Sequence, residues 1–130
     1  MPRTTAEIKA EANEFQSILD NAPTTVDNGD LLVEYLGGLN YVISRTGLMM
    51  AEVQKLYDTA YNKVFADSFK QIKELSATMA KKFVESAIAD EDALIVWVTQ
   101  LNKTAKHQAD NLRTQISYAK ESMRITKTGY

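Results

Sequence analysis

The feature that most constrains the fold is the stretch from Asp90 to Arg124, which contains no glycine and no proline. Apolar or small residues recur along it at intervals of three and four, as on one face of an α-helix, with a single polar interruption at Gln108. This face consists of Leu94, Val98, Leu101, Ala105, Leu112, Ile116, Ala119 and Met123. The pattern predicts one long helix of about nine turns with a continuous apolar face.

Charged residues mark both ends of this helix. Three acids, Asp90 to Asp92, stand at its start, where the helix dipole favours negative charge, and basic residues followed by Gly129 stand at its end. We therefore expect a helix over about residues 90–124.

A second long helix is predicted over about residues 30–67. Two apolar registers with a spacing of seven run through it, and a further apolar flank widens the stripe, as in a helix that contacts two neighbours. The registers are Leu32, Leu39, Thr46, Val53, Ala60 and Leu36, Ile43, Met50, Tyr57, Val64, and the flank is Tyr35, Val42, Met49, Leu56. Gly37, Gly38 and Gly47 each cost about 1 kcal/mol in a helix. The alternative is therefore a helix that begins only at Leu39.

Two shorter helices complete the prediction. Thr4 and Glu7 have the spacing of a capping box at the start of a helix over about residues 5–21, in which Ile8, Phe15 and Leu19 share a face. A loop rich in turn residues follows, up to Asp30. Another helix is predicted over about residues 76–89, because apolar residues recur at three and four through Ile72, Leu75, Met79, Phe83 and Val84 or Ala87.

These elements predict a single all-α domain over residues 1–130, either a helical bundle or a long antiparallel helical hairpin with about four helices. We expect the second and last helices to pack antiparallel as its spine. Each would be about 50 Å long. A globule of this length has a radius of gyration of only about 14 Å, so apolar surface at the ends of the rods would be left uncovered. We therefore expect a homo-oligomer.

Composition excludes several kinds of chemistry. The chain has no cysteine and one histidine, His107, which excludes thiolate sites and the Glu-x-x-His pairs of di-iron bundles. We interpret His107 as a surface residue that can pair with Asp110 on the same helix face. The carboxylates lack the repeated spacing that a magnesium-dependent hydrolase needs on facing helices. The sequence predicts no catalytic residue, no metal site and no cofactor.

The charge distribution along the chain is uneven. The first 34 residues have a net charge of −5, whereas residues 101–130 have a net charge of +4. The basic residues of the last helix are Lys103, Lys106, Arg113, Lys120, Arg124 and Lys127. Four of them are spaced by seven and form a stripe. Such a stripe can contact nucleic acid phosphates, or it can dock on the acidic first helix at Glu7, Glu11 and Glu14, which is the outcome we expect.

No targeting or membrane signal is visible in the sequence. The N-terminal residues have no apolar core of signal-peptide type, and the longest apolar run, Ala93 to Val98, is far shorter than a membrane span. We expect no membrane association and a cytoplasmic location.

One segment of the last helix resembles a known group of proteins. The string formed by Leu101-Asn102, Thr104, His107-Gln108, Asp110, Leu112 to Thr114 and Ile116 to Lys120 resembles the C-terminal segment of small helical proteins that tailed phages and prophages encode near their recombination and early genes. The resemblance lies mainly in residues 94–124. It implies a phage accessory protein that acts in the host cytoplasm, either in DNA recombination or as an inhibitor of a host protein.

The sequence thus favours a non-enzymatic helical module for protein binding or assembly, acting on a host or phage protein. The first alternative is a nucleic-acid-binding accessory of phage recombination or replication that uses the basic stripe. The second alternative is a metal-dependent nucleotide hydrolase.

Overall fold

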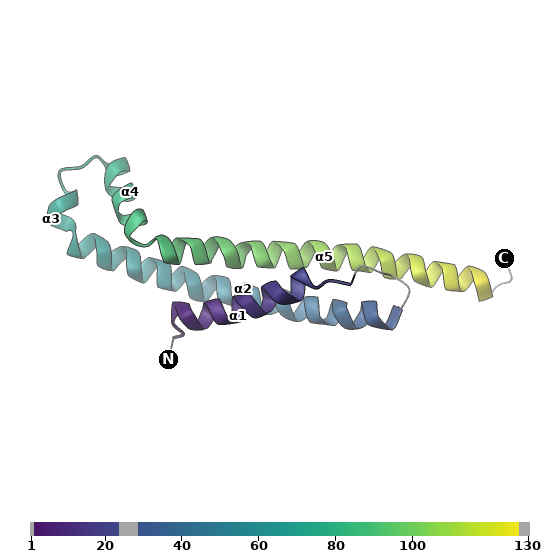
Figure 1. Cartoon of the computed structure of the whole chain (residues 1–130). Helices are drawn as coiled ribbons and strands as arrows, with labels where there is room; N and C mark the ends of the chain where they lie inside the picture. Colours follow the sequence, from purple (N-terminus) through teal and green to yellow (C-terminus); the bar gives the residue numbers. More distant parts are fainter. Residues whose placement is uncertain (1, 24–28, 128–130) are drawn as a thin grey trace.

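The computed structural model describes residues 2–23 and 29–127, and within them the chain is all-α, as predicted. Two long helices run antiparallel as a hairpin, a shorter helix lies along both, and the chain turns at the closed end through two small helices (Figure 1). The elements are α1 Thr5–Asp20, α2 Gly29–Asp67, α3 Phe69–Ile72, α4 Ala77–Ala87 and α5 Ala89–Lys127. With 39 residues each, α2 and α5 are about 58 Å long.

The helix α2 is continuous through its three glycines, so the alternative of a start at Leu39 is wrong. The reason is that apolar side chains which precede Leu39 in the sequence are already buried. Leu32 is only 1% exposed, and Tyr35 and Leu36 are half-buried against the core. Packing of the first turns thus offsets the low helix propensity of Gly37 and Gly38.

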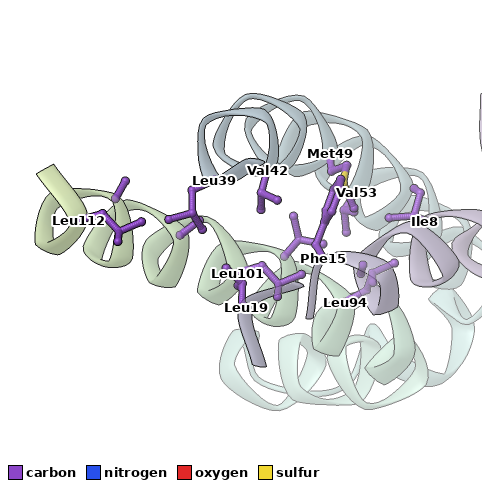
Figure 2. Packing of buried hydrophobic residues seen from close by; sticks show 14 of the residues in the cluster. Ile8, Phe15, Leu19, Leu39, Val42, Met49, Val53, Leu94, Leu101 and Leu112 are labelled. Carbon is purple, nitrogen blue, oxygen red and sulfur yellow. The ribbon is translucent and has the colours of Figure 1, made fainter. Parts of the chain in front are cut away.

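One apolar core joins α1, α2 and α5 (Figure 2). Val53, Leu94 and Val98 lie fully inside it, which confirms the predicted antiparallel spine. The predicted registers of α2 need a correction: Val42 and Met49, assigned to a flank, are completely buried, whereas Met50 is 37% exposed. The shift follows from α1, which packs on the side of α2 that carries Met49, where Figure 2 shows Phe15 beside it.

Gln108, the polar residue that interrupts the apolar face of α5, connects three helices. Its side-chain amide donates to the Leu19 carbonyl (3.3 Å), and its oxygen accepts a hydrogen bond from the Tyr35 hydroxyl (2.7 Å). Ala109 takes the buried position instead. Further along, Met123 was expected on the apolar face but is 62% exposed, because α5 extends past the first turn of α2 (Figure 1).

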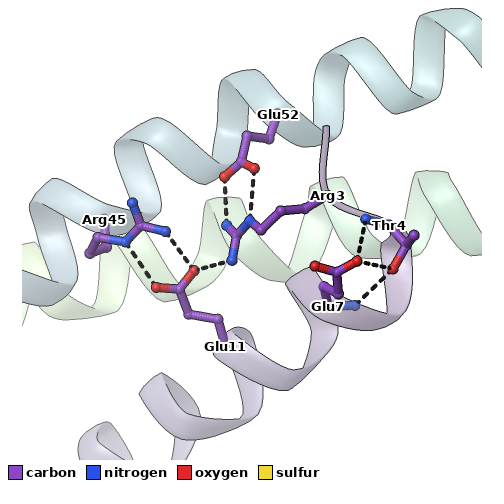
Figure 3. A network of polar contacts seen from close by, with 6 residues as sticks. All are labelled: Arg3, Thr4, Glu7, Glu11, Arg45 and Glu52. Atoms are coloured by element: carbon purple, nitrogen blue, oxygen red, sulfur yellow. Dashed lines mark hydrogen bonds and ion pairs between the residues drawn. The ribbon is translucent and has the colours of Figure 1, made fainter. Parts of the chain in front are cut away.

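Four charged residues fix α1 to α2 (Figure 3). Arg3 donates two hydrogen bonds to Glu52 (2.9 and 2.6 Å) and one to Glu11 (2.7 Å). Arg45 donates two further bonds to Glu11, both 2.8 Å long. The capping box predicted at Thr4 and Glu7 is present beside this network. The hydrogen bonds from Arg45 and then from Arg3 hold the pKa of Glu11 below its ordinary value of 4.5.

We expect Glu11→Gln to lower the free energy of unfolding by about 1–2 kcal/mol at neutral pH, because both arginines lose a charged acceptor. A depressed carboxylate pKa stabilises the fold above the ordinary pKa, and this contribution is lost as pH falls through 4.5 to the lower folded value. The difference in free energy of unfolding between wild type and Glu11→Gln should therefore shrink progressively as the pH falls below 4.5. Glu14→Gln, at an exposed acid of the same helix, is the matched control. Equal stability of wild type and Glu11→Gln at pH 7 would contradict this role.

Candidate interaction surface

At the closed end of the hairpin the chain reverses direction within residues 61–88, which we call the tip. The helix α2 ends at Asp67, α3 forms a single turn, and Ser76 caps α4 by accepting a hydrogen bond from the Met79 N–H (3.2 Å). Ile72, Val84 and Ile88 are each at most 2% exposed and lie outside the main core. The tip is therefore held in place by a small buried group of its own.

Phenylalanine is distributed unevenly over the structure. Three of the four phenylalanines lie at the tip and are exposed: Phe65 at 41%, Phe69 at 52% and Phe83 at 40%. The fourth, Phe15, is buried in the main core. The rings of Phe65 and Phe69 contact each other, with centroids 6.1 Å apart. Exposed large apolar side chains gathered in one region are typical of binding surfaces.

Two more exposed apolar residues belong to the same region, and they correct the sequence analysis. Leu75 is 40% and Met79 is 53% exposed, although both, like Phe83, were expected on the packing face. The inward face of α4 carries Ala80 and Val84 instead. These residues follow Met79 and Phe83 by one position in the sequence. Because a helix of 11 residues directs only a narrow stripe at its neighbours, the adjacent side chains stay outside.

The tip carries a small net positive charge. Residues 61–88 carry five basic and three acidic side chains. The basic residues are Lys63, Lys70, Lys73, Lys81 and Lys82, and the acidic ones are Asp67, Glu74 and Glu85. Lys81 forms a long ion pair with Glu85 (3.8 Å). The tip thus combines exposed aromatic rings with an excess of lysines.

A shallow pocket adjoins the tip between α2 and α4. It is lined by Tyr57, Asp58, Tyr61, Asn62 and Lys81. The two tyrosine rings stack with centroids 6.1 Å apart. Burial, together with the nearby carboxylates of Glu85 and Asp92, raises the pKa of Tyr57. The pocket extends the aromatic surface from the tip along α2.

The basic residues predicted as a nucleic-acid surface lie along α5. Their positions are exposed at Lys103, Lys106, Arg113, Lys120 and Arg124, and the side chain of Lys127 falls outside the described residues. Arg113 donates to Asp110 (3.0 Å) and to Asn40 of α2 (3.2 Å). Arg124 pairs with Glu121. Arg113 and Arg124 therefore each have an acidic partner on their own helix.

The expected docking of this stripe on the acidic first helix is wrong. Glu11 pairs with Arg3 and Arg45, and no ion pair found among the described residues joins α1 to α5. The helix α5 faces α1 through Trp97, which donates to Gln16 (3.0 Å), and through Gln108. Arg113 follows Gln108 by five residues and so lies about 140° around the helix, beside α2.

The expected pairing of His107 with Asp110 is not observed. His107 is exposed as expected, but Asp110, its proposed partner, bonds to Arg113 instead. Within residues 2–23 and 29–127, no group of three or more histidine, cysteine, aspartate or glutamate side chains is arranged to hold a metal ion.

Comparison of the chain with protein-family models, with curated proteins and with solved structures finds no match. Among the described helices, none combines the length and the apolar content needed to cross a membrane.

Proposed function

We propose that this chain is a non-enzymatic helical module that binds another protein through the tip of its hairpin. The observation that carries the proposal is the exposure of Phe65, Phe69 and Phe83 in a chain that buries its other phenylalanine. Burying a phenylalanine side chain gains about 1.5–3 kcal/mol, so three half-exposed rings in one region represent an unused driving force for association. Aromatic anchors at the centre of an interface typically contribute most of its binding energy.

The rest of the hairpin supports this role by holding the tip rigidly. The main core and the network around Glu11 fix α1 and α2, and Val84 and Ile88 fix α4. A preorganised surface loses little conformational entropy on binding. The excess of lysines at the tip favours a partner that carries acidic residues beside an apolar groove.

The setting we propose is that of a phage or prophage accessory protein acting on a host or phage protein. The support is the resemblance of residues 94–124 to small helical phage proteins. The tip, residues 61–88, lies outside this segment.

Replacing two tip phenylalanines tests the proposal. We expect Phe69→Ser with Phe83→Ser to abolish the capture of a partner from a bacterial lysate, because the apolar anchors are removed. The melting temperature should stay within a few degrees of that of wild type, because both side chains are about half exposed and lie outside the main core. A matched control is Tyr118→Ser with Met123→Ser, which removes two exposed apolar side chains at the opposite end of α5. Capture of the same protein by the stable tip variant would refute the proposal.

The same experiment addresses nucleic acid binding, the alternative function. One observation favours it: no ion pair among the described residues joins these basic residues to α1, and Lys106, Arg113 and Lys120 are exposed. Nuclease treatment of the lysate and a rise in salt should leave an apolar protein complex intact, whereas both would release a complex held by phosphate contacts. If nuclease treatment removed all captured material, the result would favour nucleic acid binding by the basic residues of α5 over protein binding by the tip.

A further inference from the structure

The helix α2 presents an exposed face without charge on the outside of the molecule. This uncharged face consists of Val33, Gly37, Asn40, Tyr41, Ser44, Gly47, Leu48 and Ala51, all of them exposed. Charged residues make up 25% of the chain. Arg45, the charged residue nearest the middle of this segment, turns away from the face and binds Glu11. Arg113 of α5 reaches one edge of the face, where it donates a hydrogen bond to Asn40 (3.2 Å). Five turns of exposed helix without charge are unusual on a solvated surface.

Large apolar side chains stand on this face. Tyr41 and Leu48 are each 59% exposed, and Val33 is 56% exposed. The ring of Tyr41 packs against the ring of Phe15 in a T-shaped arrangement, with ring centroids 6.0 Å apart. The face is separate from the tip, which lies at the end of α2 (Figure 1).

The glycines of this face leave space that no described residue fills. A Cβ atom added at Gly37 or Gly47 would meet nothing within 4 Å in the part of the chain that the structure describes. Glycine destabilises a helix interior relative to alanine, and here none of the described elements uses the space it leaves. An element approaching α2 from outside would use that space, because glycine permits close contact between helices.

We propose that the uncharged face of α2 binds the same face of a second copy of this chain, with the two helices antiparallel. An uncharged face can meet itself across a two-fold axis without repulsion between like charges. Glu34 and Lys55, both exposed, lie ten and eleven residues on either side of Ser44. With the axis at Ser44, an antiparallel pair places each Glu34 near Lys55 of the second copy, whereas a parallel pair places Glu34 against Glu34.

The same axis brings apolar side chains together. At 100° per residue, Tyr41 and Leu48 lie on one edge of the face, whereas Asn40 and Gly47 lie on the other. The two-fold axis of an antiparallel pair keeps each edge on its own side, so Tyr41 of one copy lies beside Leu48 of the other. Gly47 leaves room for the helices to approach at the opposite edge. The contact from Val33 to Lys55 is about 33 Å long and one helix wide, which is at the low end of specific interfaces. It implies a dimer that forms in the micromolar range.

Sedimentation velocity from about 5 to about 200 µM tests the dimer, because this range brackets a micromolar dissociation constant. The wild type should shift from monomer to dimer across the range. We expect Leu48→Glu to remain monomeric throughout, because it places a carboxylate near the axis. Val96→Glu is the matched control: Val96 is an aliphatic residue of nearly equal exposure (56%) on α5, and its variant should dimerise like wild type.

A charge exchange tests the orientation. Glu34→Lys and Lys55→Glu should each weaken the dimer by roughly five- to ten-fold, and the double variant should regain most of the affinity, because it restores opposite charges. The tip variant Phe69→Ser with Phe83→Ser should dimerise normally, which separates this inference from the proposed function. A wild type that stays monomeric at 200 µM, or a dimer that Leu48→Glu leaves intact, would overturn the proposal. Capture of a different protein by this face of a monomeric wild type would also overturn it.

Discussion

Val53→Asp is expected to destabilise the fold by about 4 kcal/mol or more at neutral pH, a large part of the 5–15 kcal/mol typical of a domain. Val53 is completely buried in the cluster that joins α1, α2 and α5. Figure 2 shows it beside Met49 and near Phe15, all apolar neighbours. A carboxylate at this position has no charged partner and loses its hydration, so the folded state bears the full desolvation cost.

Urea unfolding followed by circular dichroism measures this effect. Val53→Ala separates the cost of a cavity from the cost of a charge, and it should lose only about 1–3 kcal/mol. Val96→Asp, at an exposed valine of α5, should unfold close to wild type. If Val53→Asp melts like wild type, Val53 cannot lie in the core.

The long helices were predictable because their signals are local. A stripe such as Leu94, Val98 and Leu101 appears in the sequence whatever it packs against, and both long helices begin within one residue of the predicted start. The capping box at Thr4 likewise depends on two residues three positions apart. Periodicity therefore determines which segments are helical.

Neighbours of a helix are not encoded in its own periodicity. The acids of α1 were expected to pair with α5, but Glu11 pairs with Arg3 and Arg45, because α1 crosses α2 at that point. At the tip, the spacing of Phe83 and Val84 did not reveal which of the two turns inward. A signal for the tip was nevertheless present: three of the four phenylalanines fall between residues 65 and 83.

The most buried polar contact between the long helices was not predicted. Asn102, 7% exposed, donates to the Thr46 hydroxyl (2.9 Å) and to the Ile43 carbonyl (3.2 Å). The Thr46 hydroxyl in turn donates to the Val42 carbonyl (2.7 Å). Thr46 had been placed in an apolar register, and Asn102 had no assigned role. Because only one alignment of α2 and α5 pairs these groups, they help to fix the register of the hairpin.

Asn102→Asp is expected to destabilise the fold by about 3–5 kcal/mol at pH 7. The change removes both amide donors and directs a carboxylate at the Ile43 carbonyl. Burial should raise the pKa of the new carboxyl above the ordinary value of about 3.9, so its penalty is present when the group is charged and declines as pH falls through the raised pKa. The difference in free energy of unfolding between this variant and wild type should therefore narrow at acidic pH. For Glu11→Gln the difference narrows because wild type loses a favourable charge. For Asn102→Asp it narrows because the buried carboxylate of the variant is neutralised.

Replacing the whole contact by apolar groups gives the matched control. Asn102→Leu with Thr46→Val leaves no unpaired donor, so its free energy of unfolding should be equal to that of wild type or higher. Urea unfolding of the three proteins at pH 7 and near pH 4 measures both effects. If the pair acts only on register, the apolar variant should keep its stability but show broadened amide resonances from helices that slide against each other. An Asn102→Asp variant as stable as wild type at pH 7 would show that this side chain is not held between α2 and α5.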